Sequence, residues 1–278
     1  MTAIFFGTLS ALVWGAGDFF GGMASRKSGT YRAVFYGEAV GLVLLLGALL
    51  FVRETPTSWE NILWGAIAGF CGAFGMLILY YAMSQGRMSI AAPVSALLTA
   101  LLPVTMGLLT EGFSSPLQLL GFAVALAAIW FVAQEHGQRL GHIRLADLRL
   151  PFISGLCFGV YFILIHLSSR ETTLWPMIVS RSVGTLTVAV FILLRRESWQ
   201  ANRVAWPFII LNGILDVGGN AFYILAGQNG RLDVAAVLSS LYPGATVLLA
   251  WLVLKEKLSN IQKLGVLAAL TAIVLITL

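Results

Sequence analysis

The stretch MSIAAPVSALLTALLPVTMGLLT, residues 88–110, contains no charged residue and decides the class of fold. A helix of this length spans the ~30 Å of hydrocarbon in a bilayer, because each residue adds ~1.5 Å. The stretch SNIQKLGVLAALTAIVLITL, residues 259–278, is long enough as well. Hydrocarbon offers the backbone no hydrogen-bond partner, so both stretches are predicted to be transmembrane helices and not strands of an open sheet.

The composition of the whole chain agrees with these two stretches. Of its 278 residues, 59% are hydrophobic and only 10% are charged. Soluble domains are about a quarter charged, because their surface must be hydrated. The net charge of +5 is spread over short segments between apolar stretches, which suits lipid headgroups and membrane topology and argues against a nucleic-acid partner. Cys71 and Cys157 fall inside apolar stretches, so they indicate neither a metal site nor a disulfide framework.

Ten transmembrane helices are predicted along the chain. A basic segment typical of a cleavable signal peptide is missing from Met1-Thr2-Ala3, so the first helix is expected to be retained. The segment 137–149 is predicted to connect a first unit, residues 1–136, to a second unit, residues 150–278. The predicted spans are 2–24, 32–52, 60–84, 88–110, 116–134, 150–168, 174–194, 204–227, 232–254 and 260–278.

The two units match each other at a constant shift of 144 residues. Each predicted unit has an odd number of helices, so the second must enter the membrane in the opposite direction from the first. Inverted repeats of this kind are typical of secondary transporters, in which similar halves alternate access to one site. The matches include Ser25-Arg26 with Ser169-Arg170, Gly86-Arg87 with Gly230-Arg231, and Gln118, Leu120 and Gly121 with Gln262, Leu264 and Gly265.

Several short motifs resemble the drug/metabolite transporter superfamily, specifically its ten-helix EamA-type members. They are Ala11-Leu-Val-Trp-Gly, Glu111 with Gln118-Leu-Leu-Gly, and Glu256 with Gln262-Lys-Leu-Gly. The resemblance covers essentially the whole chain. It implies an all-α membrane protein whose two inverted five-helix repeats surround a central cavity, with spans 5 and 10 at the periphery. This chain departs from the family pattern at one point: Arg181 occupies the family's arginine position in the second repeat, but Gly37 occupies it in the first, followed by Glu38.

The distribution of lysine and arginine predicts the orientation. The odd-numbered loops are much richer in these residues than the even-numbered loops, which places the odd loops in the cytoplasm and both termini outside. The resemblance implies the opposite, because related transporters more often have both termini inside. The odd loops hold Arg26, Lys27, Arg32, Arg87, Arg139, Arg144, Arg149, Arg195, Arg196, Arg203, Lys255, Lys257 and Lys263, and the even loops hold Arg53, Arg170 and Arg231.

Four ionisable residues lie within predicted spans: Asp18, Glu38, Arg181 and Asp216. Each costs ~2.5–3.5 kcal/mol at the bilayer centre, so such groups persist only when they are paired, neutralised or in contact with water. At the 144-residue shift, Asp18 corresponds to Phe162, and Asp216 to Gly72. The two units thus share framework residues but not their charged residues. This pattern predicts a substrate-specific site on a symmetric scaffold.

Two polar stripes run along single helices at helical spacing. Asn212, Asp216, Asn220 and Tyr223 form the first, which lines either a transport pathway or a hydrogen-bonded seam between helices. Ser10, Trp14, Asp18 and Ser25 form the second. A tryptophan beside a carboxylate suits a cationic or aromatic ligand, although plain packing explains it equally well.

Arg181 and Glu38 lie in equivalent helices of the two units, and two interpretations are open for them. Arg181 pairs with Asp216, Asp18 or Glu38 as a structural ion pair, or it binds an anion or acts as a gating charge. Glu38 is alternatively a proton-coupling carboxylate, whose protonation changes when the site opens to water.

Aromatic and hydroxyl side chains complete the predicted pathway. Tyr80 and Tyr81 are near a span end, so an interfacial role is the alternative for both. Pro93 and Pro103 in the fourth span, and Pro243 in the ninth, are expected to break their helices and free carbonyls to line a cavity. The remaining pathway candidates are Ser95, Tyr161, Ser239 and Tyr242.

These features predict a secondary active transporter for a small polar or amphipathic metabolite, such as an amino-acid-like solute or an amine. A glycine-rich ATP-binding loop is missing from the sequence, so a proton gradient, exchange or the solute's own gradient supplies the energy. A flippase for lipid-linked substrates is the alternative on the same fold. Enzymatic motifs such as Gly-x-Ser-x-Gly and His-Glu-x-x-His are also missing, so neither enzymatic activity nor a metal or other cofactor is expected. The expected partners are a small-molecule substrate and the lipid bilayer, and a monomer in the cytoplasmic (inner) membrane suffices for transport.

Overall fold

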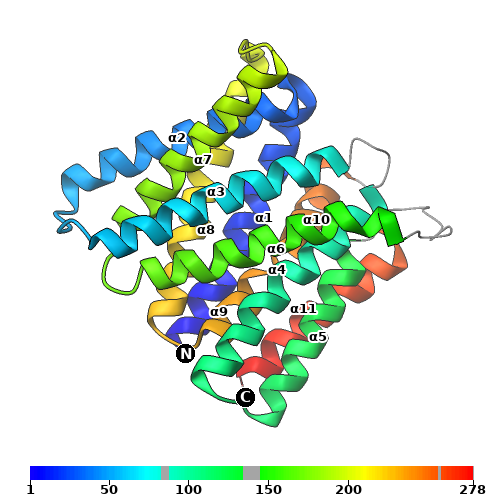
Figure 1. Cartoon of the computed structure of the whole chain (residues 1–278). Coiled ribbons are helices and arrows are strands. Elements are labelled where there is room, and N and C mark those ends of the chain that lie inside the picture. Colours follow the sequence, from blue (N-terminus) through cyan, green and yellow to red (C-terminus); the bar gives the residue numbers. More distant parts are fainter. Residues whose placement is uncertain (83–87, 134–144, 256–257, 278) are drawn as a thin grey trace.

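The computed structural model describes residues 1–82, 88–133, 145–255 and 258–277, and within these ranges all side chains except those of residues 80, 88–93 and 145–147. The described residues form helices and no strand. Figure 1 shows them packed as one bundle. The first half contains α1 (Thr2–Ser28), α2 (Thr30–Phe51), α3 (Trp59–Ala82), α4 (Met88–Glu111) and α5 (Pro116–Val132). The second contains α6 (Leu145–Ser168), α7 (Leu174–Arg195), the 3-10 turn η2 (Arg203–Ala205), α8 (Trp206–Gln228), α9 (Leu232–Ser239), α10 (Tyr242–Leu254) and α11 (Asn260–Thr277).

The predicted all-helical membrane fold is confirmed. In the described ranges, 9 helical segments are long and apolar enough to cross a membrane, with α9 and α10 together making one of them. The shorter apolar helix α5 follows the same pattern. Apolar side chains such as Leu50, Leu109 and Leu194 are exposed on the outside of the bundle. Such an exterior suits lipid, because hydrocarbon does not require polar cover.

Helix boundaries differ from the predicted spans at two places. α1 continues to Ser28, beyond the expected end at residue 24, and α6 begins at Leu145, before the expected start at residue 150. The end of the predicted connecting segment 137–149 is therefore helical. Both extensions carry charged residues, which apolar runs do not include but which a helix tolerates where it leaves the hydrocarbon.

The 144-residue shift also relates the helices in space. Thr30 and Leu174 begin α2 and α7, and Pro116 and Asn260 begin α5 and α11. The packing follows the same relation: α1 packs along α8 as α6 packs along α3, while α2 contacts α7 and α5 contacts α11. Equivalent capping boxes start the last helix of each half, with Ser115 and Gln118 in α5 and Ser259 and Gln262 in α11.

The ninth span is broken and the fourth is not. α9 ends at Ser239 and α10 starts at Tyr242, as predicted for the region of Pro243, because proline has no N–H to donate to the carbonyl of residue 239. The predicted breaks at Pro93 and Pro103 are wrong, since α4 is continuous from Met88 to Glu111. Membrane helices tolerate proline when neighbouring hydroxyls satisfy the freed backbone groups. The carbonyls that Pro93 and Pro103 leave without an intrahelical N–H are those of Ser89 and Thr99.

Candidate functional site

Arg181 of α7 joins two carboxylates that come from two other helices. Its Nη1 lies 2.8 Å from Oε1 of Glu38 on α2, and its Nη2 pairs with Oδ2 of Asp216 on α8. The arginine side chain is only 8% exposed. We call Glu38, Arg181 and Asp216 the central charged cluster. It brings together three of the four charges predicted within the membrane. Of the interpretations left open for Arg181, the structure contains the ion pair with Glu38 and Asp216.

Two features hold Arg181 in place. Gly41 of α2 faces it so closely that a Cβ at position 41 would lie 3.4 Å from Nε of Arg181. The carboxylate of Glu54, from the link between α2 and α3, accepts the N–H groups of Thr173 and Leu174 at 2.7 and 2.8 Å. A carboxylate at a helix N-terminus satisfies free donors and stabilises the helix dipole, so Glu54 fixes the start of the helix that carries Arg181.

The polar network continues from Asp216 toward α6. Nδ2 of Asn220 donates to the backbone carbonyl of Asp216 at 2.8 Å and approaches its Oδ2 at 3.4 Å. The hydroxyl of Tyr161 donates to Oδ1 of Asn220. Asn212, one turn before Asp216, instead donates to the carbonyl of Gly17 on α1 at 2.9 Å. The predicted stripe on α8 therefore serves both as a seam between helices and as part of the charged network.

Asp18 of α1 stands beside this network without joining it. Its side chain is exposed and interacts electrostatically with Asp216. Within the described ranges it has no hydrogen bond or ion pair. Asp216 is itself 33% exposed. Two accessible carboxylates on the helices of a membrane protein thus interact electrostatically, and one of them, Asp216, is paired with Arg181.

Trp14 and Tyr223 lie in an aromatic cluster and are both buried. The Trp14 ring lies 5.3 Å from that of Phe162, 5.9 Å from that of Tyr223 and 6.3 Å from that of Tyr242, measured between centroids. The Tyr223 hydroxyl donates to the carbonyl of Phe162 at 2.9 Å. Edge-to-face and offset contacts at these distances are typical of stable aromatic packing. Trp14 thus packs among rings in this structure.

Ser95 and Ser239 lie in seams between helices and not in the central charged cluster. The hydroxyl of Ser95 is 3.1 Å from that of Ser154, and the hydroxyl of Ser239 is 3.5 Å from the carbonyl of Gly7. Tyr81 is exposed near the end of α3. The side chain of Tyr80 and residue Glu256 lie outside the described residues.

A second charged group, which sequence reasoning missed, links α4 to α9. Asp233 is 0% exposed, pairs with Nη2 of Arg231 at 2.7 Å and accepts the hydroxyl of Ser114 at 2.9 Å. The carboxylate of Glu111 accepts the N–H of Leu232 at 3.2 Å. We call Glu111, Ser114, Arg231 and Asp233 the α4–α9 clasp. Its sequence signal is an aspartate just inside an apolar run, where the other half has Ser89.

The arginine position is not shared by the two halves. Gly37 occupies in α2 the place that Arg181 occupies in α7. A Cβ at position 37 would lie 2.6 Å from Oδ1 of Asn212, so a larger side chain there would require the Asn212 side chain to move.

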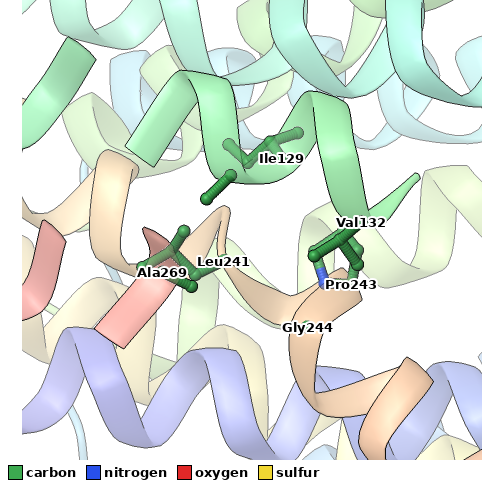
Figure 2. A pocket seen from close by; sticks show the side chains of 7 residues that line it. Ile129, Val132, Leu241, Pro243, Gly244 and Ala269 are labelled. Atoms are coloured by element: carbon green, nitrogen blue, oxygen red, sulfur yellow. The ribbon is translucent and has the colours of Figure 1, made fainter. Parts of the chain in front are cut away.

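A small apolar hollow lies away from these charges. It has no interior space for a water molecule and is lined by Ala128, Ile129, Val132, Leu241, Pro243, Gly244 and Ala269. Figure 2 shows it between α5, α11 and the start of α10, beside the helix break. Its lining offers no side chain that binds polar solutes. In the described part of the chain, His, Cys, Asp and Glu residues form no group of three that could hold a metal ion.

Comparisons with known proteins cover the whole chain. The sequence matches the EamA-like transporter family over residues 1–134 and again over residues 148–278. An uncharacterized protein of Methanocaldococcus jannaschii, MJ1333.1, is 29% identical over 130 residues, which are 46% of this chain and 93% of that protein. A solved structure described as a crystal structure of a protein covers 99% of this chain and 96% of its own, with a TM-score of 0.79 and 16% identity. At that identity the likeness concerns the fold alone.

Proposed function

The chain belongs to the EamA-like transporter family, and from that premise we propose that it is a secondary active transporter of small organic amines. The family consists of multi-pass membrane transporters, which interact with the bilayer and with a small-molecule substrate. The choice of an amine as the substrate goes beyond family membership. It rests on the accessible carboxylates of Asp18 and Asp216 beside a single buried arginine.

The balance of charge in and around the central charged cluster carries the proposal. Asp18, Glu38 and Asp216 supply three carboxylates, and Arg181 supplies one guanidinium. Arg181 already pairs with Glu38 and Asp216, so an anionic substrate would find no free positive charge in this group. An ammonium group between Asp18 and Asp216 would instead reduce their repulsion. A charge inside the membrane is strongly unfavourable unless it is paired, so the site favours a cation.

The cycle is proposed to use exchange of the amine against protons. Carboxylates that bind either a proton or an ammonium group, but not both, couple the two movements in opposite directions. We further propose that residues 1–136 and 150–278 form the two moving units and that one chain forms the complete pathway. We propose that the protein lies in the cytoplasmic (inner) membrane, where the positive-inside count favours an orientation with both termini outside.

The flippase alternative is not favoured. Family membership points to a transporter, and the central charged cluster lies among α2, α7 and α8 with Glu38 and Arg181 largely buried. Such an enclosed arrangement suits a small solute better than the headgroup of a lipid whose tail remains in the bilayer.

Uptake into proteoliposomes tests the proposal. We expect tyramine and phenylethylamine to be transported, driven by a pH gradient, while the anion 4-hydroxyphenylacetate is not. Asp18→Asn and Asp216→Asn should each lower amine uptake by about 100-fold, because each removes a carboxylate proposed to pair with the ammonium group and close charge pairs between partners are worth several kcal/mol.

The matched control is Glu60→Gln, which removes an exposed carboxylate in the first turn of α3. It should transport at the wild-type rate. Wild-type uptake of the anion in preference to the amines would contradict the proposal, and so would normal amine uptake by both aspartate variants.

A further inference from the structure

The two carboxylates that hold Arg181 are not equivalent. Glu38 is 17% exposed, whereas Asp216 is 33% exposed. Oε2 of Glu38 is packed toward α7, where a Cβ on Gly184 would lie 3.4 Å from it. Asp216 interacts electrostatically with Asp18, and Nδ2 of Asn220 approaches its Oδ2 at 3.4 Å. Glu38 is therefore the enclosed partner of Arg181, and Asp216 is the accessible one.

The arginine meets these partners through different nitrogens. Nη1 contacts Glu38 and Nη2 contacts Asp216, so one contact can open while the other remains. A buried guanidinium that loses every partner is strongly destabilised, because nothing replaces the water it gave up. With one partner retained, most of that penalty is avoided.

We propose that Glu38 is a positioning residue. It keeps its ion pair with Arg181 when Asp216 breaks its own pair with Arg181 and binds the substrate's ammonium group. This inference rests on the proposed function, because it concerns how the same site takes up an amine. In the empty site, Arg181 bridges Glu38 and Asp216. As the amine binds, Nη2 leaves Asp216 and Nη1 stays with Glu38, so each buried charge keeps a partner before and after binding.

This partner exchange makes predictions that a static ion pair does not. In Glu38→Gln, Arg181 has only Asp216 as a carboxylate partner in the cluster, so it competes more strongly with the amine. Removing the competitor as well, in Glu38→Gln/Arg181→Gln, should free Asp216 and restore amine binding. A purely structural role for Glu38 predicts no such recovery, because the double variant loses more of the structure than the single one.

Binding of tyramine to the purified protein, measured by isothermal titration calorimetry, tests the exchange. We expect the dissociation constant to rise at least about tenfold in Glu38→Gln, and the double variant to return to within about threefold of the wild type. Glu38→Asp keeps the charge on a shorter stem and should fall in between. Thermal unfolding of each variant checks that the protein is folded.

An unchanged affinity in Glu38→Gln overturns the exchange, as does a double variant that binds no better than the single one. If Glu38→Gln does not fold, wild-type affinity in Glu38→Asp overturns it instead. The proposed function fails separately: in that case wild-type protein binds none of the amines, or Asp18→Asn and Asp216→Asn leave their binding intact.

Discussion

The molecule contains two groups in which an arginine pairs with a carboxylate. They differ in how exposed the aspartate is and in how fully it is hydrogen-bonded. In the α4–α9 clasp, Asp233 is completely buried and receives bonds from Arg231, from the hydroxyl of Ser114 and from the N–H of Val234. In the central charged cluster, Asp216 is partly accessible. The clasp therefore has little capacity for another ligand, whereas the cluster has an accessible carboxylate.

We propose that this difference distinguishes a structural ion pair, the α4–α9 clasp, from a substrate site, the central charged cluster. Arg231 also donates to the backbone carbonyl of Glu111 at 3.1 Å, so it links the end of α4 to the start of α9. Its hydrogen bonds to Asp233 raise the pKa of Arg231, which stays charged at any physiological pH. A pair whose buried carboxylate is fully hydrogen-bonded stabilises one arrangement of the helices. We propose that a pair with an accessible carboxylate can bind a solute.

The strongest test of the comparison is Asp233→Asn. It removes the buried carboxylate that pairs with the partly exposed Arg231 and should lower the free energy of unfolding by about 2–3 kcal/mol, because charge-assisted hydrogen bonds are lost. Chemical unfolding in detergent measures the loss. A change below about 1 kcal/mol would show that the clasp is not a structural pair.

A smaller effect is expected for Arg231→Lys. Lysine keeps the charge but cannot contact Asp233 and the carbonyl of Glu111 with separate nitrogens of one planar group. We expect a loss of about 1–2 kcal/mol in the same unfolding assay, in line with the loss of charge-assisted hydrogen bonds. Equal stability of Arg231→Lys and the wild type would mean that charge alone holds the clasp.

The smallest change in stability is expected for Asp216→Asn, although this variant should lose amine transport. Arg181 retains Glu38, so the free energy of unfolding should fall by less than about 1 kcal/mol. The same unfolding assay, run beside Asp233→Asn, gives the direct comparison. A loss as large as that of Asp233→Asn would place Asp216 among the structural pairs and remove the distinction between the two groups.

The sequence predicted the helices well because the bilayer imposes a length that hydropathy measures directly. The span at 174–194 corresponds to α7, for example, and the break near Pro243 follows from the missing N–H. The continuity of α4 could not be predicted, because it depends on whether neighbouring groups satisfy the carbonyls that Pro93 and Pro103 leave free.

Periodicity predicted which face of a helix is polar but not what that face contacts. Asp216, Arg181 and Glu38 were recognisable because charges in apolar runs need partners, yet their pairing depends on how α2, α7 and α8 pack. Ser95 and Ser239 belong to helix seams, which spacing does not distinguish from a pathway. Asp233 was missed because a charge at the edge of an apolar run usually reaches water.

The glycine at position 37 has a consequence for how such a protein evolves. Two identical half-chains assembled about a two-fold axis would carry the arginine of position 181 twice, on helices that touch each other. Each of the two guanidinium groups would then need a carboxylate partner within the same membrane-spanning bundle. Duplication and fusion into a single gene allow one copy to lose its arginine while the other keeps it. Every later substitution near the axis then changes one side only, so specificity can be selected without a compromise between two copies.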